Sequence, residues 1–183
     1  REVSQFSDCV VVSYRTVVRS AVFDLLLNIL LLQIQLVGRG FIVRGGITEG
    51  LLYHRNNVVF GPAMVEAHRL ESEDAIYARI LVDPELIDVA RDYPGLHHSG
   101  NDEVRYVEEF LGKDVDGKRY LKYVGWDAVV ECAGADSEDW PRYMGSLARV
   151  LERGLASDDL RVVYKMLWLH REYRTAIDHF FVP

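Results

Sequence analysis

Apolar residues recur at three- and four-residue steps over residues 16–37, and this spacing predicts a mostly buried helix that ends at the glycines that follow. A second amphipathic stretch covers 62–74 and starts at Pro62, a residue favoured in the first turn of a helix. Toward the C-terminus the same spacing predicts helices over 139–154 and 158–180.

Shorter segments rich in β-branched and aromatic residues, separated by turn residues, predict strands. These segments are 1–14, 41–60, 77–82, 104–111 and 120–126. Each of the first two is expected to form two strands around a turn, and the polar residues 97–102 are expected to form a loop. A chain of 183 residues is long enough for a full core. The pattern therefore predicts one α+β domain, with helices 16–37 and 62–74 on one face of a sheet.

The composition argues against several classes of protein. With 28 acidic and 21 basic residues the net charge is −7, so the chain has no basic field for binding nucleic acid. The longest apolar run, 25–37, is shorter than the roughly 20 residues that span a bilayer, so we expect no membrane segment. Cys9 and Cys132 form no disulfide or metal-ligand pattern, which favours a reducing cytoplasm.

The first half of the chain contains several spaced motifs of Asp, Gly and Arg residues that are candidates for a functional site. The corner Phe6–Asp8 places a carboxylate at the tip of the first predicted hairpin, where an Asp is common for local reasons alone. It is followed by Arg44–Ile47 with Gly50, and then by Gly61, Ala67 and Arg69. In this order and spacing the motifs of residues 1–83 resemble class III nucleotidyl cyclases, most closely the pyrimidine cyclases of bacterial Pycsar antiphage systems.

The resemblance implies a ferredoxin-like cyclase sheet and a head-to-tail homodimer with its active sites at the interface. It implies conversion of UTP or CTP to cyclic UMP or CMP and pyrophosphate, with two Mn²⁺ or Mg²⁺ ions, as a signal to a separate effector. Asp8 would be the second metal ligand, and Arg69 the transition-state cation supplied across the interface. The chain opens at Arg1 without Met, and the first metal aspartate is expected on an upstream strand about 45 residues before Asp8.

The same resemblance assigns substrate-binding positions and shows departures from the family pattern. The residue that orients the ribose, an Asn in the family, is Val65 here, and Glu66 beside it is expected to take part of that role. The two positions that read a purine base are Ser4 and Val58, which match neither purine code and suit a pyrimidine. Lys113 resembles the family lysine that reaches the triphosphate.

Further arginine and histidine residues are considered as site residues, and two other functions remain open. Arg44 and Arg79 are weaker phosphate-facing candidates, and His97 and His98 read as part of a polar loop rather than a metal site. In the cyclase architecture, the Asp8 hairpin and the strands at Arg44 and at residue 58 belong to one sheet. A purine cyclase with an atypical base pocket, and a catalytically silent cyclase-like module that binds a nucleotide or dimerises, remain alternatives.

Overall fold

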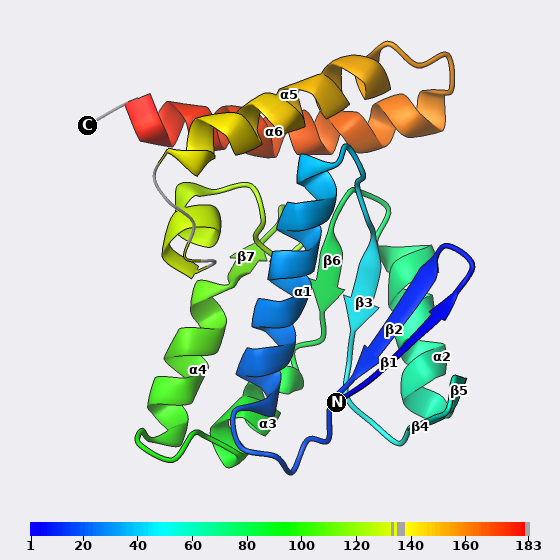
Figure 1. The fold of residues 1–183 in the computed structure, drawn as a ribbon, viewed down its shortest axis with the longest axis vertical. Helices are drawn as coiled ribbons and strands as arrows, with labels where there is room; N and C mark the ends of the chain where they lie inside the picture. Colours follow the sequence, from blue (N-terminus) through cyan, green and yellow to red (C-terminus); the bar gives the residue numbers. More distant parts are fainter. Residues whose placement is uncertain (133, 135–137, 182–183) are drawn as a thin grey trace.

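The computed structural model describes residues 1–132, 134 and 138–181, which form an α+β fold with small sheets (Figure 1). Its strands are β1 Glu2–Phe6, β2 Cys9–Ser13, β3 Gly45–Ile47, β4 Tyr53–Arg55, β5 Val58–Phe60, β6 Ile80–Val82, β7 Leu111–Lys113 and β8 Arg119–Leu121. Its helices are α1 Ala21–Gly38, α2 Pro62–Arg69, α3 Leu86–Asp92, α4 Gly100–Glu109, α5 Asp139–Leu155 and α6 Leu160–Phe181. Two π-helical segments, η1 Leu70–Asp74 and η2 Asp127–Cys132, complete the elements.

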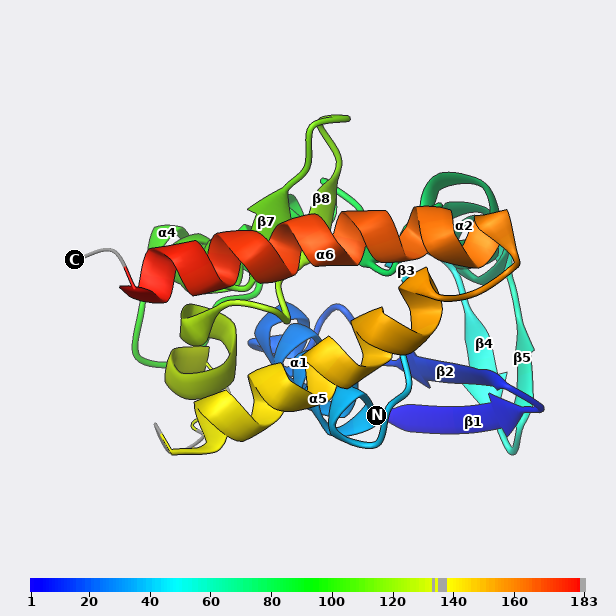
Figure 2. The same cartoon turned by 90° about the horizontal axis from the view of Figure 1, so that it is seen from above.

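A four-stranded sheet in the order β3-β6-β8-β7 forms the centre of the fold. β3 runs parallel to β6 with Gly46 opposite Leu81, and β8 pairs antiparallel with both β6 and β7. β6 is buried at all three positions, as expected of a strand covered on both faces. The figures show α1 in front of this sheet and α2 behind its β3 edge (Figures 1 and 2). The prediction that both helices cover one face is therefore wrong.

Helix α1 supplies much of the core. Its stripe of buried residues includes Leu26 and Leu30, both with no exposed surface, and α5 packs against it. Within the described residues, α1 is also the one helix long and apolar enough to span a bilayer by length and composition, a test that core helices of this kind also pass. Helices α5 and α6 pack against each other across one end of the sheet (Figures 1 and 2).

A buried ionic network fastens α6 to the sheet. Arg79, at the start of β6, is completely buried and forms an ion pair with Asp114, whose carboxylate is also buried. Asp114 further accepts hydrogen bonds from the Trp168 indole at 2.5 Å and from Arg171 at 2.7 Å, both on α6. A second guanidinium nitrogen of Arg79 lies 2.5 Å from Asp116. Charges removed from water in this way are tolerated because each is paired and hydrogen-bonded.

Two hairpins stand apart from this sheet. β1 pairs antiparallel with β2, β4 pairs antiparallel with β5, and each pair forms a sheet of its own. The expectation that the Asp8 hairpin, the strand after Arg44 and the strand at Val58 share one sheet is wrong for the described chain. Each of β2 and β3 has only one neighbouring strand among the described residues, so one edge of each is left without a strand partner.

Segment 97–111 differs most from its prediction. Residues 104–109 are part of helix α4 rather than a strand, and the polar segment before them caps that helix. The Ser99 side chain accepts from the Asp102 backbone N–H, while the Asp102 carboxylate accepts from the Ser99 N–H. This reciprocal capping box is a helix start signal, and the apolar residues Val104, Val107 and Phe110 that follow it fall at three-residue steps.

Candidate functional site

A polar network joins the two hairpins. Ser4 is 2% exposed, and its hydroxyl lies 2.9 Å from His54 Nε2 and 3.2 Å from Asn57 Oδ1. The other ring nitrogen of His54 lies 2.8 Å from the Ser13 hydroxyl. In the β1–β2 register, Ser4 faces Val11 and therefore lies on the same face as Ser13. One imidazole on β4 thus holds both strands of the first hairpin, a role that nothing in the sequence spacing indicated.

Val58 points away from this network. In the β4–β5 register, Val58 pairs with Arg55, whereas His54 pairs with Val59, so Val58 and His54 lie on opposite faces of the hairpin. Val58 is half exposed. The structure therefore brings Ser4 next to the turn at Asn57 but does not place Ser4 and Val58 in one pocket. The expected base-reading pair is not assembled within the described chain.

Asp8 occupies the expected turn between β1 and β2. Ser7, just before it, adopts a left-handed conformation with φ 56°, which lets the chain reverse within two residues. The Asp8 side chain is exposed, and no hydrogen bond or ion pair to it is found within residues 1–132, 134 and 138–181. This geometry leaves its carboxylate available to an external ligand.

Arg69 lies at the end of α2 and is held by carboxylates of its own chain. Its guanidinium lies 2.7 Å from Glu66 and 2.9 Å from Asp74, with Glu73 at 3.9 Å. The hydrogen bonds to Glu66 and Asp74 raise the Arg69 pKa, and the same contact with Arg69 lowers the pKa of Glu66. Lys118, 2.5 Å from Asp74, is the largest cause of a lowered Asp74 pKa. Arg69 is thus a fixed and fully charged cation with 42% of its side chain exposed.

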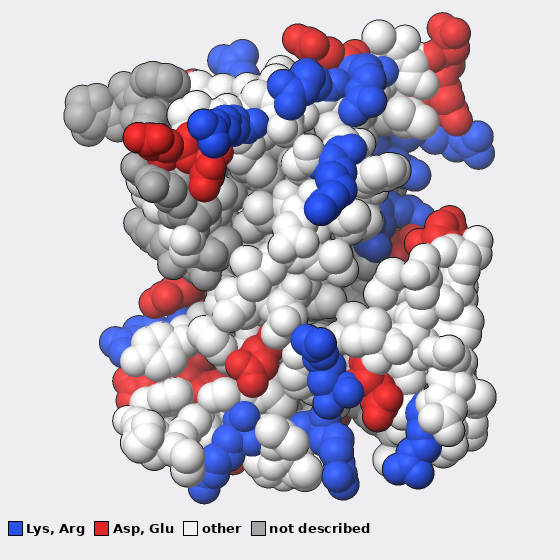
Figure 3. Space-filling view, in the orientation of Figure 1, with Lys and Arg blue, Asp and Glu red and all other residues white. Residues whose placement is uncertain are grey.

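Apolar side chains are exposed on α2 and on the outer face of β4–β5. Val65 is 70% exposed, and its position four residues before Arg69 puts both on one face of α2. Tyr53 and Phe60 stack with ring centroids 4.9 Å apart on the outer face of β4–β5, the same face as Val58. We call the following exposed residues the hairpin patch: Leu51, Tyr53, Val58, Phe60 and Val65. Figure 3 shows the lobe formed by the hairpins and α2, on the right, as mostly uncharged.

The remaining predicted residues lie elsewhere. Lys113 is on β7, the edge of the four-stranded sheet opposite β3, and so does not approach the hairpins through the sheet. Arg44 precedes β3 and forms an ion pair with Glu71 at 2.5 Å. Arg79 is the buried centre of the ionic network described above, so its assignment as a phosphate-facing residue is wrong. Glu66 is engaged by Arg69.

The two-metal site implied by the cyclase resemblance is not complete in this part of the chain. Among the described residues, no group of three or more His, Cys, Asp or Glu side chains is placed to hold a metal ion. Asp8 is the single carboxylate that they contribute at the expected place. The described residues alone therefore do not fit a pair of divalent ions.

His98 has a structural role. Its Nε2 lies within hydrogen-bond distance of the buried Glu103, whose same carboxylate oxygen accepts from the Ser20 hydroxyl at 3.1 Å and the Gly95 N–H at 3.0 Å. These contacts fasten the start of α4 to the start of α1. His98 therefore contributes to packing.

Searches of protein-family models, of curated proteins and of solved structures found no match to this chain.

Proposed function

We propose that this chain belongs to a homodimeric pyrimidine nucleotide cyclase that converts UTP or CTP to the cyclic monophosphate and pyrophosphate. The proposal rests on the motifs shared with class III nucleotidyl cyclases and on one structural observation. Arg69, with 42% of its side chain exposed, lies on the same helix face as Val65 of the hairpin patch, and carboxylates of its own chain hold its guanidinium in place. An exposed cation held in this way is suited to reach a substrate bound by a second copy of the chain.

In such a shared site, Asp8 and Arg69 of one chain would belong to different active sites. In a head-to-tail dimer, the hairpin tip of one protomer would meet α2 of its partner. The hairpin patch would supply the apolar contact surface, because exposed apolar side chains grouped on one lobe are typical of association surfaces. Val58 and Val65, which are both exposed, would then line the nucleotide site from the Arg69 side.

The proposal requires one further strand. The cyclase architecture joins the Asp8 hairpin to the sheet of β3, and the described chain does not make that connection. A strand inserted between the unpaired edges of β2 and β3 would hydrogen-bond to both and unite the two sheets. The resemblance assigns the first metal carboxylate to just such a strand, upstream of Arg1.

A second candidate is the catalytically silent module that dimerises or binds a nucleotide. The structure favours it at two points: Arg69 is already neutralised by Glu66 and Asp74, and the position of the ribose-orienting Asn is held by the apolar Val65. In this case the hairpin patch has the same association role, and no nucleotide is turned over.

Incubating the natural full-length protein separately with UTP, CTP, ATP and GTP in the presence of Mn²⁺, and identifying the products by mass spectrometry, tests the proposal. Cyclic UMP or cyclic CMP is the expected product. Formation of cyclic AMP or cyclic GMP alone would establish the purine alternative. Absence of every cyclic product, with the protein folded and dimeric, would overturn the enzymatic proposal in favour of the silent module.

A further inference from the structure

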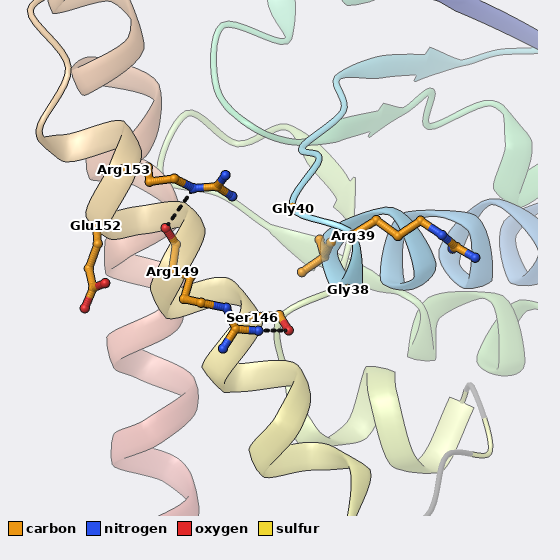
Figure 4. A pocket seen from close by; sticks show the side chains of 8 residues that line it. Gly38, Arg39, Gly40, Ser146, Arg149, Glu152 and Arg153 are labelled. Atoms are coloured by element: carbon orange, nitrogen blue, oxygen red, sulfur yellow. Dashed lines mark hydrogen bonds between the residues drawn. The ribbon is translucent and has the colours of Figure 1, made fainter.

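A basic cavity lies at the end of the molecule where α1 stops and α5 passes. Its volume is about 430 Å³. Residues 37–40, at and after the C-terminus of α1, line one side, and Ser146, Arg149, Glu152 and Arg153 of α5 line the other. Figure 4 shows Arg149 and Arg153 extending from α5 toward the end of α1, whereas the Glu152 side chain points away.

Neither guanidinium facing this cavity has a carboxylate partner among the described residues. Arg149 donates to the Ser146 hydroxyl at 2.9 Å, and Arg153 donates through Nε to the Arg149 carbonyl at 3.3 Å. In an acidic protein of net charge −7 this is a notable arrangement, because elsewhere on α5 Arg142 has an ion pair with Asp139. Each of the two guanidinium groups keeps N–H donors that no described protein atom uses.

The Arg153 guanidinium lies close to Gly40, just after α1. Gly40 has φ +84°, and a Cβ on this residue would stand 2.8 Å from a guanidinium nitrogen of Arg153. A side chain at position 40 would therefore push the guanidinium out of its place beside the cavity. Both arginines are exposed, and the negative end of the α1 dipole helps to hold cations at this place. Neither Arg149 nor Arg153 donates to an α1 carbonyl in the described structure, so their remaining N–H groups stay open to another acceptor.

We propose that this cavity binds a small phosphate-bearing anion, with Arg149 and Arg153 as its charged ligands and Ser146 as a neutral donor. Guanidinium groups match the geometry of phosphate oxygens and donate two parallel hydrogen bonds each. Two unpaired cations favour a ligand with at least two negative charges over a simple carboxylate. The volume accommodates a group of the size of pyrophosphate.

Isothermal titration of the protein with inorganic pyrophosphate, in EDTA and without divalent ions, tests this site. The conditions separate it from a nucleotide site, which in the proposed cyclase holds its phosphates through metal ions. Arg149→Gln and Arg153→Gln are each expected to weaken pyrophosphate binding at least tenfold. Arg142→Gln, which removes the same charge from the same helix, is the matched control and is expected to change affinity less than twofold.

Three outcomes would overturn the proposal. One is no measurable binding at 5 mM pyrophosphate. Another is an equal loss in the Arg142→Gln control, which would mean a diffuse charge effect. The third is loss of binding in Asp8→Ala, which would place the anion in the nucleotide site. Unchanged pyrophosphate binding in Asp8→Ala supports the proposal, whatever the outcome of the nucleotide incubations.

Discussion

The four-stranded sheet region buries an ion pair, whereas the two hairpins leave large apolar side chains in contact with solvent. Arg79 and Asp114 have no exposed side-chain surface, and α6 donates two hydrogen bonds to Asp114. Phe60, in contrast, is 59% exposed, and β2 and β3 each offer an edge without a strand partner. The buried charges of the sheet region are paired and its apolar groups are covered within the described chain. The hairpins have the features of a region that is completed by something else.

The largest effect is expected in the sheet region. Asp114→Ala leaves the Arg79 guanidinium buried with only the partly exposed Asp116 as its partner, and breaking a buried pair in this way costs about 3–5 kcal/mol. Urea denaturation should show this loss in the free energy of unfolding. The control Asp88→Ala removes an exposed carboxylate paired with Arg91 and should cost less than about 1 kcal/mol. Equal losses in the two variants would mean that the buried network does not carry the stability assigned to it.

In the hairpin region the largest effect is expected on activity. Asp8→Ala and Arg69→Ala should each lower turnover of the full-length protein by a factor on the order of 100 to 1,000, because each removes a charge proposed to act on the phosphates. Mixing the two inactive variants should restore activity, since a heterodimer contains one site with both residues intact. Subunit exchange is checked by native mass spectrometry. If exchange occurs and the mixture stays inactive, the site is not shared between protomers.

Acid should weaken the sheet region through Asp114. Burial acts to raise the Asp114 pKa, but hydrogen bonds from the Val115 N–H, Arg171 and Trp168 outweigh burial and hold the pKa below its ordinary value. The unfolded chain therefore takes up this proton at a higher pH than the folded chain does. The stabilisation is complete above about pH 4 and is lost as the pH falls through the folded-state pKa. Unfolding free energies measured from pH 6 to pH 2 should fall less steeply in Asp114→Asn; parallel profiles would contradict this.

Removing the His54 contacts between the two hairpins should have a moderate effect on local stability. His54→Ala removes the ring that contacts Ser4 and Ser13, each contact contributing about 0.5–1.5 kcal/mol. Amide exchange should accelerate in β1–β2 and stay unchanged in β6. His68→Ala, at an exposed position of α2, is the control and should change neither. Faster exchange throughout the molecule would show that the hairpins and the sheet unfold as one unit.

The smallest effect on stability is expected within the hairpin patch. Phe60→Ser should change the free energy of unfolding of the monomer by no more than about 1 kcal/mol, because the ring is largely in solvent and loses mainly its stacking on Tyr53. The same change should weaken self-association in sedimentation experiments. Leu160→Ser, which is 80% exposed at the start of α6, is the matched control and should leave association unchanged. Equal association of Phe60→Ser and the unmodified chain would remove the patch from the proposed interface.

Sequence periodicity located the long helices well. α1, α5 and α6 lie within a few residues of their predicted bounds because a continuous apolar stripe specifies a helix locally. The prediction of a strand at α4 was wrong because Val104 and Val107 also suit a strand. The capping box at Ser99 is the signal that distinguishes the helix from the strand. Sheet membership was not predictable, since pairing between distant strands depends on contacts that no local pattern contains.

The candidate site was predictable in its turns but not in its side-chain environment. The corner at Asp8 follows from local turn chemistry and is found where expected. Arg69 was correctly placed on a helix, although that helix was predicted to run to residue 74 and α2 ends at Arg69; its pairing with Asp74 depends on how η1 continues the helix. The opposite facing of Val58 and His54 depends on strand register, and shifting the register by one residue would reverse it.

The most direct test of the incomplete hairpin region is hydrogen exchange on this 183-residue chain and on the natural full-length protein. We expect the amides of β2 and β3 to exchange fast in the 183-residue chain and to become protected in the full-length protein. The amides of β6 and β8 should be protected in both. Unchanged exchange in β2 and β3 would contradict this expectation, because no strand would then occupy the edges that the proposed cyclase site requires.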